Sequence, residues 1–559
     1  MGMAVAAAAL IIYGLYADHQ NRILSGILLA LDCIGWFYFL HPPINVHSFQ
    51  FWLFCWLMVF TGIILFRKGP VIRTKNPGHP GKKNLKNESD YSDLKRFFIA
   101  IPGLIAMAVF AVCWAFIDLL CSPLFRSRDY SRRISAETVS FSEIPAFNFS
   151  ETAVIDRESA QLVGDKVMGE MTDLVSQFDV SGEYSQISYE GGTYRVTPLA
   201  YSGLIKYFRN ASQGVPGYIL VNTTTGNARL QRLSQKMKYV PSAYFNDNLY
   251  RRLRFAYPTV LFGNPTFEID DEGNPYYVCT TYTYTGITAM KKAAGVILYD
   301  PTDGSSERYS LSDVPSWVDR VFPESLVNEE LNDYGKYQKG FWNSLFGQEG
   351  VIQTSEGYNY ISKDGDIWLY TGMTSAASDE SNLGFMLVDL RTHEAQYTSV
   401  SCATETAVMA SAEGEVLNYG YTATFPTLIN AGGKPVYLLS LKDSAGLIKM
   451  YAMVDAQDYQ QVYTAKAEKE PGSAIAQLLK QVGGASSEVL KTVSFVIRDL
   501  NQVELSGNTV LFLSDGSAVY RLDLSEENAA KAAFLKTGDS ISCSYSEEES
   551  GVRNIMSLE

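Results

Sequence analysis

The stretch GVILYDPTDGSSERYSL, Gly295–Leu311, has the pattern of a tight β-hairpin. Large apolar residues follow the glycine, an Asp-Pro-Thr-Asp-Gly turn comes next, and a second strand returns. The same outline, a Gly followed five positions later by Asp or Asn, occurs elsewhere in this chain of 559 residues. The repetition predicts a chain built largely from recurring antiparallel units.

Three further copies of the hairpin are present. They are GYILVNTTTGNARLQRL, GFMLVDLRTHEAQYTSV and MYAMVDAQDYQQVYTA, the last of which lacks the glycine. The signature residues of the four copies are Gly217, Asn222, Gly295, Asp300, Gly384, Asp389 and Asp455. Asp and Asn are common turn formers, and no stretch has the alternating oxygen ligands of a calcium loop. The pattern therefore favours turn geometry over a metal site.

A second turn-and-strand signal precedes each copy, as in EGGTYRVTPL and KDGDIWLYTG, and helical patterns lie between the β segments. Each unit is therefore expected to be α+β, a helix with a small antiparallel sheet. Four such repeats are predicted over 161–485, with boundaries at about 161–240, 241–345, 346–420 and 421–485.

The first unit resembles the extracytoplasmic PepSY and cystatin-like modules, in which a helix precedes a curled sheet. Its segments LVGDKVMGEMTDLVSQFDVSGEYSQISYEGGTYRVTPL and GYILVNTTTGNARL occur in the expected order. The third copy departs from this pattern, with Thr392 and His393 where the turn glycine would be. The resemblance implies an inhibitory, ligand-holding or assembly role outside the cytoplasm, with no catalytic residues to carry over.

The C-terminal segment 486–559 changes to a strand-rich pattern. Its order, three strands, a helical SEENAAKAAFL and two more strands, resembles an OB-fold, a small β-barrel. The segment is acidic, and the whole chain has a net charge of −14, which disfavours nucleic acid as a partner. A protein-docking role is the remaining inference for this domain.

The N-terminal region 1–121 contains four apolar runs, Met3–Ala17, Ile23–His41, Phe49–Phe66 and Phe97–Cys121. About 20 apolar residues cross the hydrocarbon of a bilayer, so the runs predict a transmembrane helical bundle with a marginal first span. Whether the run 3–17 spans or is processed stays open.

The loop 67–96 between the last two runs is rich in Lys and Arg, which places it on the cytoplasmic side. The stalk 122–160 and everything after about residue 121 are then extracytoplasmic, and the chain is expected to be a multipass plasma-membrane protein. Four arginines just beyond the last run oppose this orientation: Arg126, Arg128, Arg132 and Arg133.

Within the second apolar run, Asp32 is a candidate functional intramembrane acid. The alternative is a packing contact between helices. Asp118, His41 and His47 are expected together near the outer ends of the runs.

Catalytic residues are difficult to assign. His393 is the sole histidine after the apolar region and is expected to be a solvated turn side chain, which argues against histidine-based triads and zinc sites. The cysteines Cys279, Cys402 and Cys543 have no metal-site spacing and are expected to be buried thiols. No cofactor or metal is predicted.

The sequence therefore predicts a noncatalytic, membrane-anchored envelope protein whose repeats and OB-like domain bind or assemble with a protein partner. One alternative is a cell-wall or carbohydrate-active hydrolase that uses a pair of carboxylates. A second is a channel or transporter component that uses the helical bundle. The oligomeric state is not predicted.

Overall fold

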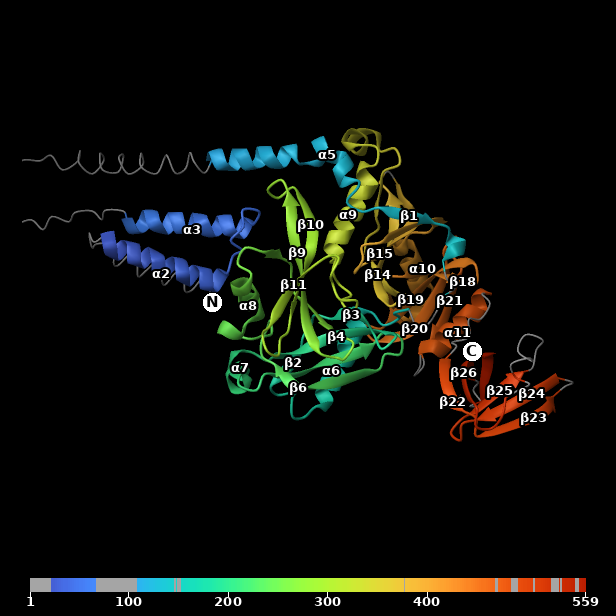
Figure 1. Ribbon diagram of the computed structural model, residues 1–559. Coiled ribbons are helices and arrows are strands. Elements are labelled where there is room, and N and C mark those ends of the chain that lie inside the picture. The colour runs from blue at the N-terminus through green and yellow to red at the C-terminus, as the bar shows by residue number, and fades with distance from the viewer. Residues whose placement is uncertain are drawn as a thin grey trace, which may run out of the picture.

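In the computed structural model, the described residues are 22–66, 108–144, 147, 152–376, 378–467, 471–483, 491–505, 508–523, 532, 535–547 and 552–558. Within them, the chain is dominated by antiparallel sheets. Figure 1 shows four of these sheets following one another around a common centre, with a fifth at the C-terminal end.

The four sheets around the centre each contain consecutive strands. Sheet 1 contains β2 (Phe178–Val180), β3 (Ser185–Tyr189), β4 (Gly192–Tyr201), β5 (Val215–Asn222) and β6 (Ala228–Met237). Sheet 2 contains β7 (Leu261–Phe262), β8 (Thr266–Ile269), β9 (Pro275–Thr285), β10 (Met290–Tyr299) and β11 (Ser306–Ser310). Sheet 3 contains β12 (Ile352–Thr354), β13 (Asn359–Lys363), β14 (Asp366–Ser375), β15 (Ser378–Asp389) and β16 (Ala395–Cys402). Sheet 4 contains β17 (Thr422–Ala423), β18 (Thr427–Ala431), β19 (Lys434–Lys442), β20 (Ile448–Asp455) and β21 (Val462–Lys466).

The strand order is the same in all four sheets. Two short strands share the first position by pairing with one long strand, and two more strands complete an antiparallel meander. In sheet 1, for example, β2 and β3 both pair with β4, which pairs with β5, which pairs with β6. An additional strand, β1 (Ala136–Val139), pairs in parallel with β16 of sheet 3. Four-stranded meanders around a centre give a ring with the layout of a β-propeller.

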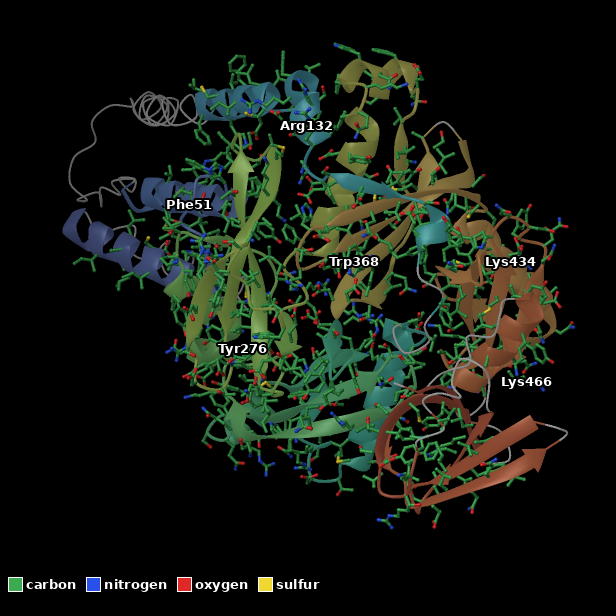
Figure 2. The ribbon with its side chains drawn as sticks, turned by 45° about the vertical axis from the view of Figure 1, so that its right-hand side comes forward. Phe51, Arg132, Tyr276, Trp368, Lys434 and Lys466 are labelled. Carbon is green, nitrogen blue, oxygen red and sulfur yellow. The ribbon has the colours of Figure 1, made fainter. Side chains whose placement is uncertain are left out.

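Hydrophobic cores lie between neighbouring sheets. One core joins sheet 1 with sheets 2 and 4, a second joins sheets 2 and 3, and a third joins sheets 3 and 4. Strands such as β5 and β14 are buried along nearly their whole length, so both faces of these sheets are covered. Figure 2, in which Tyr276 marks β9, Trp368 marks β14 and Lys434 marks β19, shows side chains filling the space between sheets.

The predicted class of separate α+β repeats, each with its own helix-covered sheet, is therefore wrong. Runs such as YILV and VILY are continuously apolar, and such strands bury both faces. Neighbouring sheets supply much of the cover that the sequence pattern assigned to helices. The helices in this part are α6 (Arg157–Glu170), α7 (Leu204–Asn210), α8 (Leu249–Ala256), α9 (Glu324–Tyr337), α10 (Glu405–Glu415) and α11 (Pro471–Val482).

The repeated glycines lie where the carbonyl of a neighbouring strand passes close to the backbone. Gly217, Gly295 and Gly384 each stand next to a register shift in their ladder. A Cβ atom on these residues would lie 2.1, 2.1 and 2.2 Å from a carbonyl oxygen of the next strand. A side chain does not fit at that distance, which gives the repeated glycine a steric cause.

The repeated Asp or Asn closes the turn that follows. In each copy its Oδ1 atom accepts a hydrogen bond from the backbone N–H two residues later, as in an Asx turn. The pairs are Asn222 with Thr224, Asp300 with Thr302, Asp389 with Arg391, and Asp455 with Gln457. The signature acid or amide thus has a local role in its turn.

The N-terminal helices in the described residues are α2 (Arg22–Leu40), α3 (Phe49–Phe66), the helix Ala108–Leu120 and α5 (Pro123–Tyr130). None of these, taken singly, is long and apolar enough to cross a membrane. The helix Ala108–Leu120 and α5 are long and apolar enough to cross a membrane only when taken together, as a pair bent by 45°.

The predicted four-span bundle, and with it the multipass plasma-membrane localisation, is therefore wrong for the described chain. The apolar parts of α2 and α3 are restricted to Gly26–Leu40 and Phe49–Thr61. The connection between them contacts the ring, where Ile44 N–H donates to the carbonyl of Pro258 at 2.7 Å. The run Met3–Ala17 and the basic loop 67–96 lie outside the described residues.

Sheet 5 contains six strands: β22 (Lys491–Val496), β23 (Asp499–Leu505), β24 (Asn508–Ser514), β25 (Val519–Asp523), β26 (Ser540–Glu547) and β27 (Val552–Leu558). Their order is β22-β26-β27-β25-β24-β23, and no pairing among the described residues joins the two end strands. The predicted closed OB-like barrel is therefore wrong. The first of the three strands expected before the helix is divided near Ile497 and Arg498, where the chain changes its partner from β26 to β24.

Candidate functional site

A cavity of about 460 Å³ lies where sheets 1, 3 and 4 meet. Its walls come from the segment 153–158 that leads into α6, from β4, from residues 358–360 at the start of β13, and from residues 422–442 of sheet 4. Arg320, which follows sheet 2, completes the lining. Residues from all parts of the ring therefore contribute to one space.

The cavity has an exposed mouth and a buried floor. Four lining residues are exposed and mark the mouth of the cavity: Arg157, Glu158, Tyr358 and Thr422. Tyr184, Arg195 and Leu438 each have an exposure of 5%. A molecule that enters past the exposed residues would meet the buried ones.

The segment 153–158 is fixed between two sheets. The N–H groups of Val154 and Ile155 both donate to the carbonyl of Thr223, at 3.0 and 2.9 Å, and Ser440 Oγ donates to the carbonyl of Val154 at 2.9 Å. Asp156 then caps α6 by accepting from Ser159 N–H at 3.2 Å. The start of α6 is therefore held rigidly against the cavity.

Two carboxylates of the cavity share one lysine. Lys442 Nζ lies 2.8 Å from Asp156 Oδ2 and 2.5 Å from Glu158 Oε2. Burial works to raise the pKa of Asp156, but the hydrogen bonds from Lys442 and Ser159 outweigh it and the pKa is lowered. Asp156 is thus held ionised rather than prepared as a general acid.

Arg320 is also paired. Its guanidinium forms an ion pair with Glu324, and Tyr360 Oη donates to the same carboxylate. Although burial opposes the charge, Tyr360 and Glu324 raise the pKa of Arg320. These three groups form one polar unit at the edge of the cavity, in which the Nε of Arg320 has no hydrogen-bond partner among the described residues.

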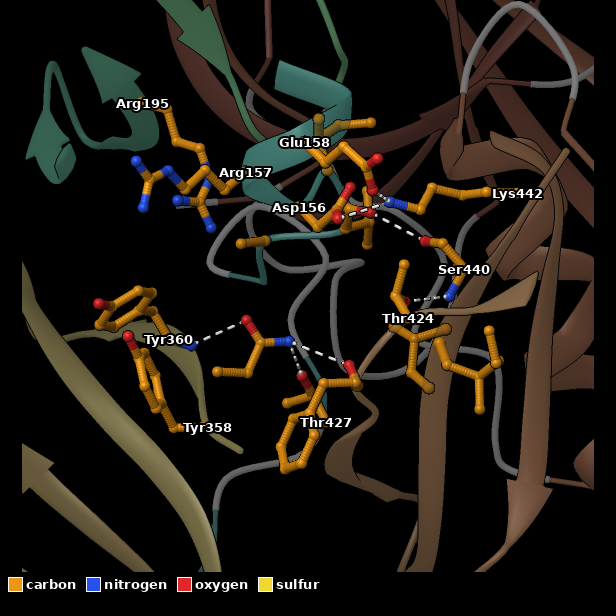
Figure 3. Close-up of a pocket in the computed structure, with 18 of the residues that line it drawn as sticks. Asp156, Arg157, Glu158, Arg195, Tyr358, Tyr360, Thr424, Thr427, Ser440 and Lys442 are labelled. Atoms are coloured by element: carbon orange, nitrogen blue, oxygen red, sulfur yellow. Dashed lines mark hydrogen bonds and ion pairs between the residues drawn. The ribbon is translucent and has the colours of Figure 1, made fainter. Parts of the chain in front are cut away.

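Arg157 and Arg195 differ from the other cations of the cavity. Arg157 donates to the carbonyl of Gly182 at 2.6 Å, and Arg195 lies 6.0 Å from the ring centre of Tyr360. Within the described residues neither guanidinium forms an ion pair with a carboxylate, and the buried Nε of Arg195 has no hydrogen-bond partner. Figure 3 shows both guanidinium groups on one side of the cavity, apart from the unit of Lys442, Asp156 and Glu158.

Two acids with raised pKa values lie outside the cavity lining. Glu268 and Asp319 are buried, with exposures of 0% and 3%, and Asp319 N–H donates to Glu268 Oε2 at 2.9 Å. Burial raises the pKa of Glu268 to about 7, and burial together with Glu268 raises that of Asp319. Asp319 also accepts from Ser188 N–H at 2.8 Å, so the pair lies where sheets 1 and 2 meet, and burial is the first cause of both shifts.

The residues singled out from the sequence lie elsewhere. Asp32 is on α2 with an exposure of 8%, and it does not line the cavity. The signature residues lie on the strands and turns described above, and none of them lines the cavity either. Asp118 and His47 do meet, since both bind the tip of the β9–β10 hairpin: Asp118 accepts from Ile287 N–H and His47 Nδ1 lies 2.8 Å from the carbonyl of the same residue.

His393 is not the solvated turn side chain that was expected. Its Nε2 lies 2.8 Å from Glu330 Oε2, and its ring stacks on Phe322 at 4.2 Å. The three cysteines Cys279, Cys402 and Cys543 are buried, and none of them forms a disulfide within the described residues.

Sequence reasoning did not find the cavity. Arg195 belongs to the strand RVTPL, where a charged residue beside continuous apolar residues is the one available signal. Arg157, Glu158 and Lys442 look like ordinary surface charges in the sequence. Their convergence depends on the ring arrangement of the sheets.

No protein-family model matches this chain, and no curated protein matches it. Among solved structures, an exo-β-1,3-galactanase from Phanerochaete chrysosporium is 8% identical, with a TM-score of 0.16 over 68% of this chain and 67% of its own. The cobalt-substituted ACO of Synechocystis is 10% identical, with a TM-score of 0.12, and the chain spans about half of its length, 50%. Likenesses this weak carry no argument about fold or function.

Proposed function

We propose that the ring is a noncatalytic binding module that holds a small molecule in the cavity between sheets 1, 3 and 4. The observation that supports this function is the cavity itself, about 460 Å³ with a buried floor and an exposed mouth. This volume falls within the range of ligand pockets in proteins.

The charges in the cavity favour binding over hydrolysis. A carboxylate-pair hydrolase needs one acid that keeps its proton and one that is ionised. Asp156 and Glu158 both bind Lys442, and the pKa of Asp156 is lowered. The alternative of a hydrolase therefore has less support than a binding role.

Ligand-observed saturation-transfer NMR on the full chain tests the proposed function. The probe is a mixture of anionic, cationic and neutral fragments, and the blocking variant is Thr422→Trp, which fills the mouth from an exposed position. Thr138→Trp, at an exposed position on β1 outside the cavity lining, is the matched control. We expect fragment signals that Thr422→Trp removes and Thr138→Trp keeps. Signals that survive in both variants, or no signals at all, would contradict the proposed function.

A further inference from the structure

We infer that the ligand of the cavity is an anion, and that a carboxylate or phosphate group of this ligand binds the guanidinium of Arg195. This inference rests on the proposed function, namely that the cavity is a binding site, and adds the chemical class of what it binds.

Arg195 is the strongest evidence for an anionic ligand. It lies on β4, an inner strand of sheet 1, opposite Gln186 on β3 and Val221 on β5. Its exposure is 5%, and its side chain lines the cavity floor. An arginine keeps its proton under ordinary conditions, so this position holds a buried positive charge.

The polar groups around Arg195 are incompletely satisfied. Its Nε, together with both amide side-chain atoms of Gln186, is buried without a hydrogen-bond partner in the described part of the chain. Residues opposite each other in an antiparallel ladder lie on the same face of the sheet. Burying a charge without a counter-ion is costly, and an anion in the cavity would offset this cost.

The remaining charges leave the cavity positive. Asp156 and Glu158 share Lys442, which leaves this group with one net negative charge, whereas Arg320 and Glu324 cancel each other. Arg157 and Arg195 form no ion pair among the described residues, although the charge of Asp156 acts on Arg195, and their two positive charges exceed the negative charge that remains on the Lys442 group. An arginine fork matches the paired oxygens of a carboxylate or a phosphate, which identifies the class of group that would bind there.

Aromatic side chains lie next to the two arginines. The rings of Tyr358 and Tyr360 are 5.6 Å apart in an edge-to-face arrangement, and Figure 3 shows them facing the side of the cavity that holds Arg157 and Arg195. The ligand that fits has an anionic group at the floor and a less polar body against these rings.

Isothermal titration calorimetry with inorganic phosphate and with acetate, at constant ionic strength, tests the inference on the full chain. We expect at least one of the two anions to bind, and Arg195→Met to weaken its affinity about 10- to 100-fold, the effect of losing a charged hydrogen-bond pair. Arg195→Lys keeps the charge but loses the fork, so it should weaken binding by a smaller factor. Arg229→Met, which removes an exposed arginine paired with Glu190 on the same sheet, should leave the affinity unchanged.

The two probes also separate the sources of the anionic group. Tighter binding of phosphate assigns a phosphorylated ligand, and tighter binding of acetate assigns a carboxylated one. If neither anion binds, or if binding persists in both Arg195 variants, the inference is overturned. Neutral fragments that Thr422→Trp displaces, together with absent anion binding, would overturn the inference alone and keep the proposed function. If neither the fragments nor the anions bind, both the proposed function and the inference are overturned.

Discussion

Two buried arginines of this protein have opposite surroundings. The side chain of Arg133 is 0% exposed and bonds to Glu329 at 2.6 Å, to Asp333 at 2.5 Å and to the carbonyl of Lys291 at 2.7 Å. Arg195 is similarly buried, yet it makes no ion pair within the described residues. The Nε of each arginine lacks a hydrogen-bond partner in the described chain, so the difference lies in the carboxylates: Arg133 is paired with them, whereas Arg195 lines a cavity.

The difference separates a structural charge from one available to a ligand. Arg133 joins the segment after α5 to α9 and to the hairpin of sheet 2, so its partners hold three parts of the chain together. Arg195 has no ion pair of this kind within the described residues, and its contact with another sheet is the ring of Tyr360 at 6.0 Å. Proteins tolerate a buried unpaired charge mainly where function requires it, because stability alone would remove it.

The largest expected effect is the loss of the paired arginine. Arg133→Met leaves the acids of α9 without their cation, and we expect the free energy of unfolding to fall by about 3–5 kcal/mol. Urea denaturation followed by tryptophan fluorescence measures this change. Arg133→Lys should recover part of the loss, and a decrease below about 1 kcal/mol would remove the distinction between the two arginines.

Buried acids extend the comparison to negative charge. Since burial raises the pKa of Glu268 to about 7, its contribution to stability is complete below its unfolded value and is lost as the pH rises through about 7. Glu268→Gln keeps the shape without the charge, so it should exceed the natural protein in stability at pH 8 by about 1–3 kcal/mol and match it near pH 4. Thermal unfolding of both proteins across this pH range measures the difference. An equal difference at both pH values would contradict the explanation.

Replacing Arg195 should change stability in the opposite direction to replacing Arg133. Without ligand, Arg195→Met replaces an unpaired buried charge by an apolar chain, and we expect a gain of about 1–2 kcal/mol in the free energy of unfolding. Chemical denaturation in an anion-poor buffer is the appropriate measurement. A loss of more than about 1 kcal/mol would mean that Arg195 supports the fold, as Arg133 does.

The smallest effect is expected at the surface. Arg229 and Glu190 are 3.6 Å apart, and both side chains are 54% exposed. Arg229→Met should change the free energy of unfolding by less than about 0.5 kcal/mol, since exposed ion pairs contribute little. The same denaturation experiment provides the value. A larger change would indicate that the net charge of the protein, rather than local pairing, determines the stability of all these variants.

The sequence was informative where the cause is local. The hairpin at Gly295 corresponds to β10 and β11, whose paired residues include Tyr299 and Ser306. The repeated glycine and the repeated Asp or Asn each act within one strand pair or one turn. Such effects depend on neighbours a few residues away, so a single sequence can reveal them.

Features that depend on distant parts of the chain were missed. The cavity joins Arg195, Tyr360 and Lys442, which come from three different sheets. Apolar runs also proved ambiguous, because hydropathy alone does not distinguish a membrane span from a shorter apolar helix that contacts the ring. The break between β22 and β23 near Ile497 could not be recognised, because the sequence there has one continuous strand pattern.

The parallel pairing of β1 with β16 has a consequence for how the protein is made. Ala136 lies opposite Ala395, so β1, the first strand of the described residues, must wait for a partner that is translated much later. At about 5–20 residues per second, the delay is roughly 10–50 s. Sheets 1 and 2 are complete before it ends, whereas sheet 3 gains its outer strand only afterwards. An unpaired strand invites pairing with another chain, so the speed of translation sets how long each nascent molecule is exposed to that error.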